Sequence, residues 1–202
     1  MIRVAAEGCL TLLTLDRPDK ANALTEAMLS DLIAAVTDAA GQHALILTGT
    51  GRVFSAGADL DAAKASLATS PLWEGLSSAI ARFDGLTIAA LNGTCAGGAC
   101  GMMLACDLRI AAPSAKLFYP VMTLGYLPQP SDPSRLTRIA GPAVAKRILL
   151  AGDKLTADDA LQAGLFDALD EDPVALARRW AGDAVSADHA HVAGIKRMIP
   201  DC

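Results

Sequence analysis

The chain has 202 residues, of which 52% are hydrophobic and 4% aromatic, with 17 glycines and a formal charge of −5. This composition is typical of a soluble globular protein with a core of small and aliphatic side chains, and it excludes a disordered chain. The net negative charge and the absence of a cluster of basic residues in the sequence argue against a surface that binds nucleic acids non-specifically. The five cysteines lack Cys-x-x-Cys spacing, so neither a disulfide framework nor a zinc site is indicated.

The N-terminal segment carries a charge at Glu7 before a hydrophobic region of signal length has formed. The most apolar stretch, residues 88–105, is interrupted by Asn92 and several glycines, which makes a membrane span improbable. We therefore expect a cytoplasmic protein.

The first half of the chain alternates strands, loops and a helix. Residues 4–6 and 10–15 read as paired strands around a Glu7-Gly8 turn. Thr25 is a good N-cap for a helix that ends at Gly41. Short buried strands are predicted over residues 44–47 and 87–91, each delivering a glycine-rich loop.

The second half is mostly helical. Further strands are predicted over residues 108–111 and 117–119, and helices over residues 133–140, 142–150, 157–163 and 173–185. No repeat or linker divides the chain. We expect one α/β domain over residues 1–202, with a helical C-terminal part from about residue 133.

The most informative pattern is the pair of glycine-rich loops, residues 54–60 and 92–100. Small residues let a ligand carbonyl approach the backbone, so the amides of Ala58 and Gly98 are candidate donors to one oxygen. Gly98 also begins a predicted helix, and the positive end of this helix dipole would help to stabilise negative charge on the same oxygen. The alternative is that these small residues only allow tight packing of helix on strand. Ser55 does not read as a nucleophile, because Val53 stands where a G-x-S-x-G elbow needs glycine.

Together with Leu15-Asp16-Arg17-Pro18, Asn22-Ala23-Leu24 and Cys106-Asp107, these loops resemble the crotonase family, also called the enoyl-CoA hydratase/isomerase family. The resemblance covers residue 10 to about residue 165. It implies a crotonase-like α/β fold of repeated strand-loop-helix units, with a shortened C-terminal helical region. It also implies an enzyme of fatty acid metabolism, a lyase or isomerase.

In this family the two amides stabilise an enolate formed from an acyl-CoA thioester. By the family pattern, Lys20, Ala21, Ala56, Ala58 and Leu60 would line the coenzyme A site. Coenzyme A would enter as part of the substrate, and no separate cofactor or metal is expected. Asp59 fits an N-cap of the segment that follows it.

The resemblance fails at the two positions where hydratases of the family carry a catalytic glutamate. Counting from Cys106 places the first at Gly101, and the proline dipeptide ahead of the intact Leu124-Gly125-Tyr126-Leu127-Pro128 places the second at Val121. We therefore expect slow hydration. Gly101 lies in a predicted helix, so we expect Gly101→Glu to leave the backbone undisturbed and, with Val121→Glu, to raise hydratase activity.

Asp132 and Tyr126 are the candidate replacements for the missing acids, with Tyr119 and Cys100 also considered. Asp132 precedes Pro133, so it fits a helix N-cap as well as a catalytic group. Tyr126 equally fits a pocket wall. Cys100 fits a small core residue.

Two functions remain open from sequence. One is an acyl-CoA enzyme that works through the oxyanion hole, where decarboxylation or thioester hydrolysis would need fewer carboxylates than hydration. The other is a non-catalytic acyl-CoA-binding or scaffold homologue. Proteins of this family are usually trimers or pairs of trimers, so we expect a homotrimer or hexamer.

Overall fold

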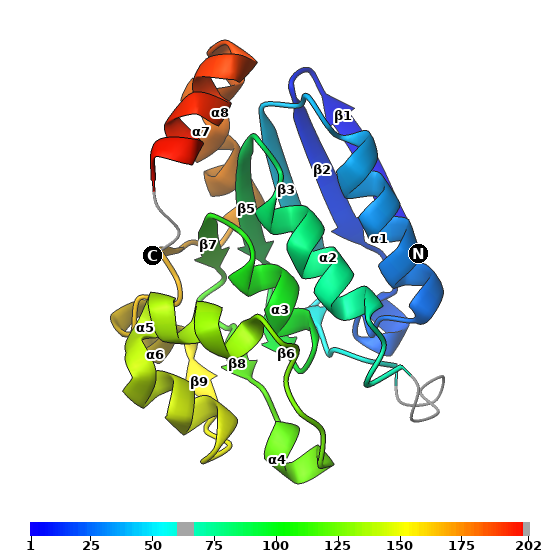
Figure 1. The fold of residues 1–202 in the computed structure, drawn as a ribbon, viewed down its shortest axis with the longest axis vertical. Helices are drawn as coiled ribbons and strands as arrows, with labels where there is room; N and C mark the ends of the chain where they lie inside the picture. The colour runs from blue at the N-terminus through cyan, green and yellow to red at the C-terminus, as the bar shows by residue number, and fades with distance from the viewer. Residues whose placement is uncertain (60–66, 200–202) are drawn as a thin grey trace.

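The larger of two β-sheets forms the centre of the fold (Figure 1). The computed structural model describes residues 1–59 and 67–199. In spatial order, the larger sheet contains β1 (Ile2–Glu7), β2 (Leu10–Leu15), β3 (Ala44–Gly49), β5 (Leu86–Leu91), β7 (Leu108–Ala111) and β10 (Ala168–Leu169). β1 and β2 are antiparallel, and all other neighbours are parallel. The strands predicted from the sequence in this sheet are confirmed.

Both faces of the larger sheet are covered. Leu45 and Leu47 belong to a core shared with α1 (Glu26–Asp38), α2 (Leu72–Ala81) and α3 (Ala99–Leu104). Ile46 and Ile88 face the opposite way and pack with Leu176 of α7 (Pro173–Ser186). Near-continuous apolar runs in β3 and β5 follow from this burial on both faces.

The smaller sheet positions the two glycine-rich loops. It contains β4 (Val53–Ser55), β6 (Thr94–Ala96), β8 (Lys116–Phe118) and β9 (Leu155–Thr156), in that order. β4 leads into the first loop and β6 leads into the second. Residues 44–47 and 87–91 form strands ahead of the two loops, as predicted, whereas the short strands β4 and β6 were not predicted.

The remaining helical elements are η1 (Pro18–Lys20), α4 (Val121–Leu124), α5 (Asp132–Leu149), α6 (Ala157–Gln162) and α8 (His189–Met198). The predicted cap of α1 is confirmed, since Thr25 Oγ1 accepts from the Met28 amide at 3.3 Å. α5 joins the two predicted helices across a break at Gly141, whose φ is +79°. α8 was not predicted. Across residues 1–59 and 67–199, no helix is long and apolar enough to cross a membrane.

Candidate active site

The two glycine-rich loops lie against each other. A Cβ added at Gly57 would be 2.8 Å from the carbonyl oxygen of Ala96 and 3.4 Å from the amide nitrogen of Gly98. Gly57 also has a φ of +90°, which side chains rarely adopt. A glycine at this position therefore permits the close approach of the loop that carries Ala58 to the loop that carries Gly98.

The first loop is held by the segment around η1. The Ala56 amide donates to Ala21 O at 3.0 Å, and Leu24 forms two backbone bonds with the loop, from its amide to Gly57 O at 2.7 Å and from the Asp59 amide to its carbonyl at 2.9 Å. Arg17 Nη1 pairs with Asp59 Oδ2. These contacts fix the peptide planes on both sides of Ala58.

The second loop leads directly into α3. The Gly97 amide donates to Phe118 O at 3.1 Å, and Gly98 is the N-cap residue of α3. In the described parts of the chain, the amides of Ala58 and Gly98 have no hydrogen-bond acceptor. Two unoccupied amides on touching loops are the arrangement that an oxyanion needs.

The residues expected at the coenzyme A site are partly brought together. Lys20 is exposed at the end of η1, and Ala21 is bonded to Ala56 next to Ala58. Leu60 lies outside the described residues, as does the segment that Asp59 was expected to cap. Within the described part of the chain, Asp59 pairs with Arg17.

Asp132 is buried at the start of α5, with 1% of its surface exposed. Its Oδ2 accepts a hydrogen bond from the Tyr119 hydroxyl at 2.9 Å. Its Oδ1 has no hydrogen-bond partner among the described residues. The N-cap interpretation of Asp132 was wrong, because Ser131 is the N-cap residue and the Asp132 side chain turns inward to Tyr119 instead of bonding the first turn of α5.

The environment of Asp132 favours its neutral form. Burial raises the pKa of Asp132 to about 7, and the like charge of Glu74 acts in the same direction. The Tyr119 hydrogen bond and the positive charge of Arg135 lower the pKa of Asp132, but the effect of burial is larger. At neutral pH this carboxyl group therefore populates both its acid and its base form.

The carboxylate of Asp132 lies beside Gly101 in α3. A Cβ added at Gly101 would be 2.9 Å from Asp132 Oδ1, 3.0 Å from Asp132 Oδ2 and 2.9 Å from Ser77 Oγ. Gly101 lies in a helix as predicted, but a side chain at this position would require the Asp132 carboxylate and the Ser77 hydroxyl to move.

Comparison with known proteins assigns a family to the chain as a whole. A family model described as enoyl-CoA hydratase/isomerase matches residues 5–199. The chain belongs to the enoyl-CoA hydratase/isomerase family. Its crotonase-like α/β fold is likewise confirmed, since a crystal structure of an enoyl-CoA hydratase from Bacillus anthracis matches with a TM-score of 0.91 and 29% identity. That match covers 99% of this chain and 82% of the other chain.

Among curated relatives, the 2,3-dehydroadipyl-CoA hydratase of Escherichia coli (strain K12) is 37% identical over 80% of this chain and 66% of its own length. The probable enoyl-CoA hydratase echA14 of Mycobacterium tuberculosis is 35% identical over 98% of this chain and 80% of its own length. The chain therefore spans about two thirds of the first relative and four fifths of the second.

In this member of the enoyl-CoA hydratase/isomerase family, the other residues considered from the sequence differ from Asp132 in their burial and hydrogen bonding. Tyr126 follows α4, is 37% exposed, and its hydroxyl makes no hydrogen bond with described residues. Val121 is buried. The pKa of the Cys100 thiol is raised by its hydrogen bond to Cys95 and by burial, so it stays protonated. Ser55 Oγ donates to Asn22 O at 2.8 Å, a structural contact.

Sequence reasoning missed Ser77 and Trp73 of α2. Ser77 lies beside Gly101, and a Cβ at Gly98 would approach the Trp73 ring at 3.0 Å. No local motif marks either residue. Their positions beside Gly101 and Gly98 follow only from the packing of α2 on α3.

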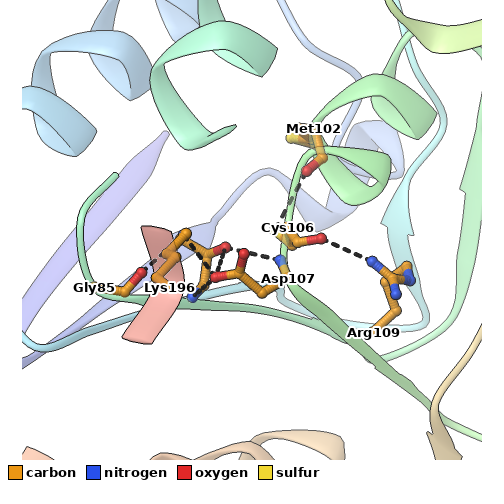
Figure 2. Close-up of polar contacts among 7 residues, drawn as sticks. Gly85, Met102, Cys106, Asp107, Arg109 and Lys196 are labelled. Carbon is orange, nitrogen blue, oxygen red and sulfur yellow. Dashed lines mark hydrogen bonds and ion pairs between the residues drawn. The ribbon is translucent and has the colours of Figure 1, made fainter. Parts of the chain in front are cut away.

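The Cys106-Asp107 motif has a structural role outside the loops. Asp107 Oδ2 accepts from the Thr87 amide at 2.8 Å and from Lys196 Nζ at 2.7 Å, while Lys196 also donates to Gly85 O at 2.9 Å (Figure 2). Arg109 Nη1 donates to Cys106 O at 2.7 Å. The Lys196 contacts hold α8 to the N-terminal ends of β5 and β7, two interior strands of the larger sheet.

A groove of about 1370 Å³ opens beside this network, between α5 and α8. Its lining includes Arg135, Ile139, Val192 and Ile195, and it includes none of Ala58, Gly98 and Asp132. The two glycine-rich loops and this groove therefore lie at different places.

Proposed function

We propose that this chain binds an acyl-CoA thioester, stabilises its enolate with the amides of Ala58 and Gly98, and uses Asp132 to remove and return the α-proton. One observation carries this proposal. A buried carboxyl group with one unpartnered oxygen lies against α3, the helix that begins at Gly98.

The proposed reaction needs only one titrating group. The α-proton moves to Asp132 Oδ1, and the electron pair of the C–H bond enters the thioester, which becomes an enolate. The charge on the enolate oxygen is stabilised by the two amides, each worth roughly 3 to 4 kcal/mol of barrier in comparable sites. Return of the proton restores the thioester and the Asp132 carboxylate.

Hydration of an enoyl thioester is disfavoured in this site. It requires activation of water at the β-carbon in addition to proton delivery at the α-carbon. Val121 is apolar and buried at the position of the second glutamate. Proton-shift isomerisation and decarboxylation, which pass through the same enolate, fit a single carboxyl group.

We further propose that coenzyme A lies along the segment of Lys20 and Ala21 and beside Ala56, and that no separate cofactor is used. The contact of Ala56 with Ala21 supports this assignment. We also propose a homotrimer. The exposure of Met122, Leu124 and Leu127 on and after α4 supports an assembly that covers these side chains.

A second candidate is a non-catalytic acyl-CoA-binding homologue. It is favoured by the loss of both glutamates at Gly101 and Val121 together with intact loops. The loops also hold the smaller sheet together, so they would be retained without catalysis.

Calorimetry and turnover separate these functions. Butyryl-CoA is expected to bind, with a thermal shift that coenzyme A alone gives more weakly, because the thioester oxygen engages the two amides. Turnover of crotonyl-CoA to the hydrated product is expected to be near background. Absence of any binding at millimolar butyryl-CoA would contradict both candidates, and rapid hydration would contradict the single-carboxylate assignment.

A further inference from the structure

Tyr119 is the hydrogen-bond donor that fixes the orientation of the Asp132 carboxylate. It follows β8 and is 5% exposed. Its hydroxyl oxygen accepts from the Gln129 amide at 3.4 Å and donates to Asp132 Oδ2 at 2.9 Å. Because Gln129 occupies the acceptor side of the hydroxyl, the phenolic proton points to the carboxylate.

The backbone of Asp132 is held separately, from α2. Glu74 Oε2 accepts from the Ser131 amide at 3.1 Å and from Ser131 Oγ at 2.9 Å. Arg135 Nη1 donates to the same Ser131 Oγ at 2.5 Å. These contacts place the start of α5 but leave rotation of the Asp132 carboxylate to Tyr119.

We propose that Tyr119 is a positioning residue, which holds Oδ2 of Asp132 and thereby leaves Oδ1 as the oxygen that exchanges a proton with substrate. This inference rests on the proposed function of Asp132. Tyr119 would then distinguish the two oxygens of the Asp132 carboxylate, which are otherwise chemically equivalent. Removal of the Tyr119 hydroxyl is therefore expected to change the titration of Asp132.

Among residues 1–59 and 67–199, four titratable groups act on the Asp132 carboxyl or feel its charge: Tyr119 after β8, Glu74 on α2, Cys100 on α3 and Arg135 on α5. Burial raises the pKa of Tyr119 well above its ordinary value, so its hydroxyl remains a donor throughout the working range. Cys100 likewise remains a thiol. Over neutral pH, Asp132 is therefore the group of this cluster whose titration responds to Tyr119.

The test is carboxyl-carbon NMR of aspartate-labelled protein, with the Asp132 signal assigned from Asp132→Asn. Tyr119→Phe is expected to raise the pKa of Asp132 by roughly one unit, because the lost hydrogen bond favoured the charged form. The pH at which α-proton exchange of butyryl-CoA is half-maximal is expected to move up by the same amount. Tyr126→Phe removes the other tyrosine hydroxyl and is expected to leave the Asp132 titration unchanged.

Incorporation of 3-fluorotyrosine provides a second measurement that does not depend on folding of the phenylalanine variant. Its more acidic phenol strengthens the donor and is expected to lower the pKa of Asp132. An unchanged Asp132 titration in folded Tyr119→Phe or in the fluorinated protein would overturn the inference. A shifted titration without α-proton exchange in the parent would instead contradict the proposed function and leave the hydrogen-bond role of Tyr119 intact.

Discussion

The carboxylate of Asp132 fills the space that a side chain at Gly101 would need, with both its oxygens 2.9 to 3.0 Å from the position of the missing Cβ. The two residues are distant in sequence and come from different helices, α5 and α3. In hydratases that this chain resembles, the α3 position carries the glutamate. Here the Asp132 carboxyl group of α5 lies against the position of that Cβ, so a side chain at residue 101 and Asp132 would compete for the same space.

This relationship predicts an energetic coupling between Gly101 and Asp132. Gly101→Ala is expected to reduce the free energy of unfolding by roughly 1 to 3 kcal/mol, because the added methyl group overlaps buried oxygens. In an Asp132→Gly background the same change is expected to cost at least about 1 kcal/mol less. Urea unfolding of the four proteins measures the coupling.

Gly182→Ala in α7 is the matched control for that cycle. A Cβ at Gly182 would meet nothing within 4 Å, so the substitution is expected to stabilise the helix by up to about 1 kcal/mol. Additive effects of Gly101→Ala and Asp132→Gly would show that the carboxylate does not occupy the space beside α3.

The raised pKa of Asp132 predicts a pH-dependent stability. The folded state holds the Asp132 proton up to about pH 7, whereas the unfolded chain releases it near its ordinary pKa of about 3.9. Between these values the folded protein binds more protons than the unfolded chain, so this group's contribution to stability falls as pH rises. The total change is up to about 4 kcal/mol for a shift of about 3 units.

Asp132→Asn removes this titration. The variant is expected to gain stability relative to the parent as pH rises from 5 to 8, because the parent alone must bury a charge. Chemical unfolding at several pH values tests the slope. A difference between parent and variant that stays constant from pH 5 to 8 would show that Asp132 is not titrating in the folded protein over this range.

The position of the Gly98 amide predicts a second sensitive residue. Gly98→Ala would place a Cβ 3.0 Å from the Trp73 ring, which is buried and cannot retreat into solvent. Displacement of the amide is expected to lower the rate of α-proton exchange by up to about 10² to 10³, with a smaller effect on thioester binding. Gly194→Ala in α8, where nothing lies within 4 Å, controls for the glycine substitution itself. Equal rates in the two variants would contradict the proposal that the Gly98 amide stabilises the enolate.

The sequence predicted what is encoded locally. The strands β1 and β2 and the Thr25 cap follow from short sequence patterns. The environment of Asp132 could not be predicted, because an Asp-Pro pair is compatible with a cap and only the packing of α2, α3 and β8 turns the side chain inward. The same holds for Tyr119, whose partner comes from another element, and for α8, which depends on the contact of Lys196 with Asp107.

The exposed apolar side chains around α4 predict an assembly. Light scattering is expected to give the mass of three or six 20.7 kDa chains. Met122→Lys with Leu127→Lys is expected to shift the population toward smaller species, because two charges would enter the covered surface. A mass of one chain at every concentration would contradict the trimer proposal.

The central claim is that Asp132 performs proton transfer on a thioester held by Ala58 and Gly98, and deuterium exchange tests it directly. The parent protein in D₂O with butyryl-CoA is expected to incorporate deuterium at the α-carbon, followed by NMR or mass spectrometry, while folded Asp132→Asn that still binds butyryl-CoA is expected to be slower by about 10² or more. Equal exchange in parent and variant, or none in a parent that binds the thioester, would contradict the claim.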